Sequence, residues 1–222
     1  GIAEHHYGCD TRMIGAEYEL VWTYAKTKYN KNIKLYNTEA GGSADPEQPG
    51  TFNPDGTKGT QFSNFTYMIR DIIHLLFLFP DKATARAFHQ PQNSPGGLEA
   101  FLFLKELRGK LVHITNPVRS VWPVASINND NLCLVLFNDN PSSVEVQIEV
   151  NSPDKMTFIS GIKCEPFLDQ YKKLSFKESN LNLKPKTKIF LETVRIPQMS
   201  AIKYIFKLDD KISDEIKPTL SR

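Results

Sequence analysis

The stretch Asn32-Ile-Lys-Leu-Tyr-Asn-Thr-Glu-Ala-Gly-Gly42 joins a strand-like pattern to a carboxylate and then to a glycine break. In a β-strand, Ile33, Leu35, Asn37 and Glu39 would share one face, because they recur at every second position. A carboxylate on an aliphatic strand face is costly unless it has a partner or a chemical task. Glu39 is therefore either a candidate catalytic group at the end of a strand or an exposed residue in a turn.

Strand and helix patterns alternate on both sides of this stretch. The sequence predicts strands over residues 2–7 and 83–89, helices over 14–29, 63–79 and 98–107, and a long loop over 41–61. This order indicates α/β architecture with parallel strands, and in a (β/α) barrel the catalytic groups lie at the carboxyl ends of the strands. Three strand–helix units cannot close an eight-stranded barrel. We therefore expect the last units of a (β/α)8 TIM barrel.

Several details of the helices can also be predicted. Leu20, Val21, Tyr24, Ala25 and Lys28 recur at helical spacing, which predicts an amphipathic helix. Beyond this set, Ser63 is expected to cap the start of the second helix and Gly109 the end of the third. Trp22 is expected to be a core residue.

After Asn116-Pro117 the pattern becomes all-β. Alternating apolar residues predict strands over 132–137, 144–150, 156–162, 188–195 and 201–208, with Asn- and Ser-rich turns between several of them. The fold class is thus α/β followed by all-β, a partial barrel joined to an antiparallel β-sandwich. The expected domains are 1–116 for the barrel portion, 117–208 for the sandwich and 209–222 for a polar tail.

Composition excludes several functional classes. A formal net charge of +2 predicts no nucleic-acid partner, and no apolar stretch is long enough to span a membrane. No motif for a metal, a nucleotide or an organic cofactor is present, and the loop over 41–61 lacks the regular spacing of a calcium loop. The three cysteines are widely spaced and odd in number, so one disulfide is possible, with Cys133 and Cys164 the favoured pair, but no sequence pattern supports it.

His5-His6-Tyr7-Gly8 and the later Leu35-Tyr-Asn-Thr-Glu-Ala-Gly41 resemble strands six and seven of retaining glycoside hydrolase barrels. The stretches over 79–88 and 101–112 are similar to the end of glycoside hydrolase family 86, which contains β-agarases and β-porphyranases. The resemblance implies a β-sandwich after the barrel and a nucleophilic Glu39. It also implies an acid/base glutamate on strand four, for which this chain has no counterpart.

A retaining glycosidase uses two carboxyl groups about 5 to 5.5 Å apart, one as nucleophile and one as acid/base. Glu39 would be the ionised nucleophile, and His5 and Tyr7, near the end of the preceding strand, would be its hydrogen-bond donors. Asn37 could bond the nucleophile or serve a structural role. His89, at the end of the next strand, is a candidate for sugar binding.

The sequence therefore predicts a secreted, periplasmic or outer-surface glycosidase that cleaves a β-linked galactan such as agarose or porphyran. It would need no cofactor, and the segment supplying the remaining barrel strands would be its partner. Two rivals stay open. One is a non-catalytic carbohydrate-binding or accessory protein on a partial barrel, and the other is an α+β interaction protein with no role in sugar chemistry.

Overall fold

The structure is a computed structural model, and it divides the chain into two compact units, Gly1–Leu102 and Phe103–Arg222. Each unit is described by itself. The residues that the structure describes are 2–7, 11–41, 60–78, 83–88, 96–112, 114, 121–152, 156–171, 173–184 and 186–209.

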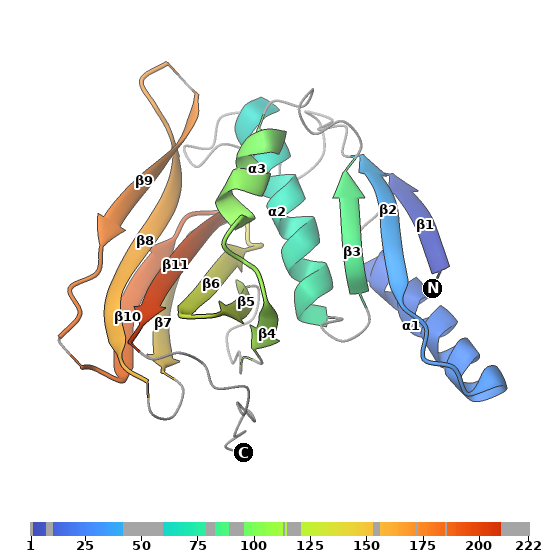
Figure 1. The fold of residues 1–222 in the computed structure, drawn as a ribbon. Coiled ribbons are helices and arrows are strands. Elements are labelled where there is room, and N and C mark those ends of the chain that lie inside the picture. The colour runs from blue at the N-terminus through green and yellow to red at the C-terminus, as the bar shows by residue number, and fades with distance from the viewer. Residues whose placement is uncertain are drawn as a thin grey trace. The chain divides into compact units, whose positions relative to one another are not determined.

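The first unit is a parallel β/α arrangement, as its sequence predicts. In chain order its elements are β1 (Ile2–Tyr7), α1 (Thr11–Tyr29), β2 (Leu35–Gly41), α2 (Thr60–Leu78) and β3 (Ala83–Phe88). The strands pair in the order β1-β2-β3, and both pairings are parallel (Figure 1). A helix forms each crossover, because parallel neighbours cannot be joined by a tight hairpin. Sequential strands are therefore neighbours, as they are in a (β/α) barrel.

The buried face of α1 differs from the predicted one. Tyr18 is 1% exposed and forms a cluster with Leu75 of α2, against which Trp22 also packs. Leu20 and Tyr24, both expected on the apolar face, are 72% and 53% exposed. Leu20 and Tyr24 were assigned to the wrong face because apolar residues occur on two sides of this helix, whereas Val21 packs against the cluster as predicted. The core role predicted for Trp22 is confirmed.

Two helix ends also differ from prediction. Ser63 lies inside α2, which begins three residues earlier at Thr60, so it is not the capping residue. The third helix, α3 (Gly97–Leu104), ends before the predicted Leu107. Gly109 does adopt the left-handed conformation, with φ of +82°, but it lies five residues beyond the helix and directly before a strand.

The second unit is an antiparallel β-sandwich. Its strands are β4 (Lys110–Val112), β5 (Val121–Asn128), β6 (Asn131–Asn138), β7 (Val144–Asn151), β8 (Phe158–Leu168), β9 (Leu174–Asn180), β10 (Ile189–Ile196) and β11 (Ser200–Leu208). Six form one sheet, in the order β4-β5-β6-β11-β8-β9, and β10 and β7 form the other. β4 pairs with β5, so Lys110–Val112 belongs to the sheet of the second unit.

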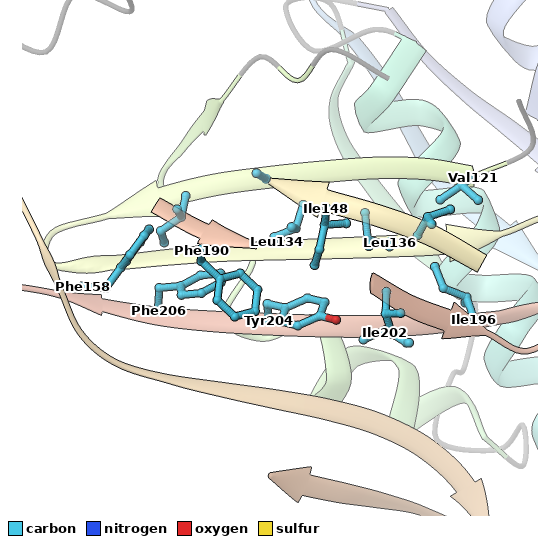
Figure 2. Close-up of a cluster of buried hydrophobic side chains, with 14 of the residues drawn as sticks. Val121, Leu134, Leu136, Ile148, Phe158, Phe190, Ile196, Ile202, Tyr204 and Phe206 are labelled. Carbon is cyan, nitrogen blue, oxygen red and sulfur yellow. The ribbon is translucent and has the colours of Figure 1, made fainter. Parts of the chain in front are cut away.

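The core of the sandwich lies between its two sheets. Ile148 and Phe190 from the smaller sheet meet Leu134, Tyr204 and Phe206 from the larger one (Figure 2). The rings of Phe190 and Phe206 are 5.1 Å apart in an edge-to-face arrangement. These are the inward positions of alternating strands, which explains why the period-two pattern located the sandwich.

Cys133 and Cys164 do not form the disulfide that the sequence left open. Cys133 on β6 and Cys164 on β8 are both free and buried. Strand β11 lies between them, with Cys133 paired to Ile205 and Cys164 to Lys203. Neighbouring strands lie about 4.8 Å apart, so residues two strands apart are separated by roughly 10 Å. That is beyond the roughly 7 Å between Cα atoms that a disulfide can bridge.

Candidate active site

The candidate site lies at the carboxyl ends of the parallel strands in the first unit. Glu39 is two residues before the end of β2, and His5 is two residues before the end of β1. Tyr7 is the last residue of β1 and pairs with Gly41, the last of β2. Carboxyl ends of parallel strands meet at one edge of a sheet, where ligands bind in α/β folds.

The strand register makes His5 and Glu39 direct neighbours. Their Cα atoms are partners in the parallel pairing of β1 with β2. Adjacent strands lie about 4.8 Å apart, which is within the reach of an imidazole and a carboxylate on paired positions. The backbone thus brings together the two residues that sequence reasoning placed on adjoining strands.

An irregularity in β2 lies immediately before Glu39. Asn37 pairs with Glu4, yet the next pair along β1 is His5 with Glu39, so Thr38 has no partner on β1. The pairing of β2 with β3 is also irregular between Asn37 and Ala40. The unbroken two-residue alternation from Asn37 to Glu39, assumed from the sequence, is therefore interrupted. Extra residues of this kind redirect side chains and are frequent beside active sites.

The third strand adds a residue that sequence reasoning did not single out. Arg86 of β3 is the register partner of Asn37. The sequence could have indicated Arg86, because it is the only charged residue in the strand Ala-Thr-Ala-Arg-Ala-Phe. His89, predicted to bind sugar, follows Phe88 at the end of β3 and lies outside the described residues.

In general, a carboxylate can serve as a nucleophile or as a base, and an imidazole can hold the anion by a hydrogen bond. In the part of the chain that the structure describes, no three His, Cys, Asp or Glu side chains group as metal ligands would. Within the same residues, no helix is both long enough and apolar enough to cross a bilayer.

Comparison with known proteins relates this fold to glycoside hydrolases. No protein-family model matches the chain, and no curated protein matches it. Among solved structures, it is similar to a family 86 enzyme in complex with neoagarooctaose, with a TM-score of 0.64 and 11% identity. It is also similar to a family 86 β-porphyranase from the human gut bacterium Bacteroides plebeius, with a TM-score of 0.59 and 15% identity. For a family 30 endoxylanase from Clostridium papyrosolvens, the TM-score is 0.54 and the identity 13%.

The alignment covers nearly the whole of this chain but only part of each neighbour. It covers 92 to 94% of this chain, and it spans 37%, 41% and 48% of the three neighbours. At these identities the likeness establishes the fold alone. The chain has the fold of part of a glycoside hydrolase, and the matches extend over families 86, 30 and 44.

Proposed function

We propose that this chain is the part of a retaining glycoside hydrolase that carries the nucleophile, Glu39. The observation that supports this most directly is the register of β1 and β2, which pairs Glu39 with His5 at the carboxyl edge of a parallel sheet. The irregularity at Thr38 supports the proposal further, because it interrupts the pairing of β2 directly before Glu39. Such irregularities change side-chain direction and are frequent beside active sites.

The reaction divides between two carboxyl groups. The Glu39 carboxylate attacks the anomeric carbon and forms a glycosyl ester, while an acid/base carboxylic acid protonates the departing oxygen. Water then hydrolyses the ester, and the acid/base group takes up its proton. His5 and Tyr7 donate hydrogen bonds that keep Glu39 ionised, and Asn37 and His89 bind the sugar. The acid/base glutamate comes from a segment outside this chain, and no cofactor takes part.

The proposed substrate is a β-linked galactan such as agarose or porphyran. The support is the likeness to a β-porphyranase and to an enzyme that binds neoagarooctaose. Such polymers are too large to enter a cell intact, so the site of action is secreted, periplasmic or on the outer surface.

The experiment tests the nucleophile by itself, with a substrate that does not need the acid/base group. A fluorinated galactoside with a dinitrophenolate leaving group needs no proton to depart, so Glu39 alone can form the glycosyl ester, and the fluorine slows its hydrolysis. We expect peptide mass spectrometry to find the added sugar on Glu39 in the unmodified chain and no label in Glu39→Gln.

Glu4→Gln is the matched control, because Glu4 lies on the neighbouring strand and pairs with Asn37. This variant should be labelled at Glu39 like the unmodified chain. Label on another carboxylate, or equal label in Glu39→Gln, would refute the assignment. Reducing-end release from agarose and porphyran, after adding the segment with the other barrel strands, then tests the full reaction.

A second function is a carbohydrate-binding or accessory protein without catalysis. It is supported by the likeness to an enzyme whose structure holds neoagarooctaose, because that likeness fits sugar binding with or without catalysis. Retention of agarose or porphyran oligosaccharides with no covalent label on Glu39 would support it over the hydrolase.

A further inference from the structure

The small net charge of the chain conceals an uneven distribution. Between Lys163 and Lys188 there are seven lysines and three acidic residues, a net charge of +4. Because the whole chain carries +2, the remaining residues carry −2. The basic stretch comprises most of β8, all of β9 and the connection from β9 to β10. Positive charge is therefore concentrated on one part of the sandwich.

The structure places this charge on the outside of the second unit. β9 is the outermost strand of the six-stranded sheet, and the β8–β9 hairpin extends beyond its neighbours (Figure 1). Lys173, Lys177, Lys184 and Lys186 are all exposed. No carboxylate among the described residues lies within 4.0 Å of their ammonium groups, whereas Lys163 is paired with Glu192 at 3.1 Å. Among the described residues, these four ammonium groups have no ionic partner, and Glu165, the register partner of Lys177, lies 3.8 Å from the Lys163 ammonium instead.

Two exposed aromatic rings lie in the same hairpin. Tyr171 is 74% exposed and Phe167 is 41% exposed. Phe167 pairs with Ser175 across the hairpin, and Lys177 is two residues farther along that strand, so Phe167 and Lys177 share a face of the sheet. The turn is held by Asp169, whose Oδ1 accepts hydrogen bonds from the backbone N–H groups of Tyr171 (2.8 Å) and Lys173 (2.9 Å).

We propose that this basic–aromatic strip of the second unit binds an anionic polysaccharide. Sulfate groups pair with the ammonium groups, and sugar rings pack their C–H faces on the aromatic rings. The strip consists of Phe167, Tyr171, Lys173, Lys177, Lys184 and Lys186. It follows β9, which is about 23 Å long at 3.3 Å per residue, and thus accommodates several sugars of an extended chain.

The choice of polysaccharide rests on the proposed function, which assigns the chain to a galactan such as porphyran, a sulfated polymer. Lysines on an edge strand also prevent edge-to-edge association of sheets. That protective role explains Lys177 on β9, but it does not explain Lys184 and Lys186, which follow the strand's end at Asn180. It also leaves the exposed rings unexplained.

The test is retardation of the full chain in native gels containing porphyran or, in parallel, neutral agarose. We expect tighter binding to porphyran, and binding that weakens as salt is raised, because exposed charges are screened. Lys173→Glu/Lys177→Glu should weaken porphyran binding at least about ten-fold at low salt. The matched control, Lys110→Glu/Lys207→Glu, reverses two exposed lysines elsewhere in the same unit and should bind as the unmodified chain does.

Phe167→Ala/Tyr171→Ala separates stacking from charge. This variant should bind both polymers more weakly, with an unchanged dependence on salt. Near-ultraviolet circular dichroism confirms that each variant is folded.

Three results would overturn the proposal. They are equal binding of the two polymers, equal loss in the Lys173/Lys177 and control variants, and binding of duplex DNA or anionic vesicles in place of porphyran. Labelling of Glu39 is measured on the same samples. If the hydrolase proposal fails, Glu39 is not labelled but porphyran still retards the chain. If the strip proposal fails, Glu39 is labelled but porphyran does not retard the chain.

Discussion

Lys203 carries a charge in the interior of the second unit. It is 3% exposed, and its Nζ donates to the backbone oxygen of Phe103 and to Glu106 Oε2, both at 2.7 Å. Its ammonium also lies 5.0 Å from the centroid of the Phe103 ring. Lys203→Ala removes these contacts and leaves the Phe103 carbonyl and the Glu106 carboxylate without their donor. We expect a loss of about 2–4 kcal/mol in the free energy of unfolding, measured with urea.

Lys207→Ala is the control on the same strand, because that side chain is 56% exposed and its contact with Asp130 is long, at 3.9 Å. Its stability should stay within about 0.5 kcal/mol of the unmodified chain. Lys203→Met, which keeps most of the buried volume, should lose less than Lys203→Ala. Equal stability of Lys203→Ala and Lys207→Ala would show that the buried contacts contribute nothing.

The two buried thiols should be inert in the folded protein. Burial raises the pKa of Cys133 to about 12 and that of Cys164 to about 11, although the nearby Lys203 ammonium lowers both. A raised pKa keeps a thiol protonated, and only the thiolate reacts, so at pH 8 each has at least roughly a hundredfold less thiolate than an ordinary cysteine.

Thiol titration with a disulfide reagent at pH 8 checks this. It is best done in a Cys9→Ser background, because Cys9 lies outside the described residues. We expect no reaction in the folded chain and two reactive thiols in urea. Rapid reaction of one thiol without denaturant would contradict the buried assignment.

Residue-scale prediction reached only what a local pattern carries. The glycine break placed Glu39 near the end of a strand and the order of the strands placed His5 on its neighbour, whereas the assumed alternation from Asn37 to Glu39 is interrupted. The catalytic roles of Glu39 and His5 stay proposals. Asn138, the last residue of β6, is not among the residues that the sequence singles out. Its buried side chain donates to the backbone oxygens of Ser142, Ile196 and Pro197. That role depends on residues up to 59 positions away, which no local pattern reveals.

At the scale of elements, Gly109 shapes the entry into β4. Its φ of +82° is strained for any side chain, and a Cβ there would lie 2.3 Å from the backbone oxygen of Ile127. Because the obstacle is backbone of the paired strand, it cannot move aside cheaply. We expect Gly109→Ala to cost roughly 2–4 kcal/mol in unfolding free energy, measured by urea denaturation.

Gly161→Ala is the contrasting case. An added Cβ would meet the Leu181 side chain at 2.7 Å, and that side chain can rotate. The loss of unfolding free energy should be smaller than for Gly109→Ala. When Leu181→Ala is already present, adding Gly161→Ala should cause no further loss, because the clashing side chain has been removed. A larger cost at Gly161 than at Gly109 would contradict this account.

Elements with strong periodicity were predicted best. The bounds of β1 agree with the predicted strand, and β3 and α2 agree to within a few residues. β4, β5 and β9 were missed, since β4 has three residues, β5 contains Pro123, and β9 is largely polar. The irregularity at Thr38 was also missed, because it arises from how β2 meets both neighbours.

At the scale of the whole molecule, the order of elements was enough to predict parallel strand–helix units followed by an antiparallel sandwich. That the first units are part of a barrel stays a prediction. The order of elements was not enough to predict which strands pair in the sandwich. The six-stranded sheet places β11 between β6 and β8, which are far from it in the chain. Such pairings depend on the combined packing of both sheets, which a local sequence pattern does not record.

The two units differ in how their described residues are stabilised. The second unit encloses a continuous buried cluster between two antiparallel sheets. In the first, β1 and β3 each pair only with β2 among the described residues, and three parallel strands are a small sheet. We therefore expect the first unit to unfold at a lower urea concentration, with a midpoint about 1 M below that of the second.

Each unit contains one tryptophan, so single-tryptophan variants can report on them separately. Trp122→Phe leaves Trp22, which packs beside Tyr18 in the first unit, and Trp22→Phe leaves Trp122 on β5 of the second. Fluorescence should give the earlier transition for Trp22, and far-ultraviolet circular dichroism of the unmodified chain should show both steps. Coincident midpoints would mean that the two units unfold as one cooperative structure. In that event the candidate site would share the stability of the sandwich, because loss of the sandwich would also disrupt the strands that hold His5 beside Glu39.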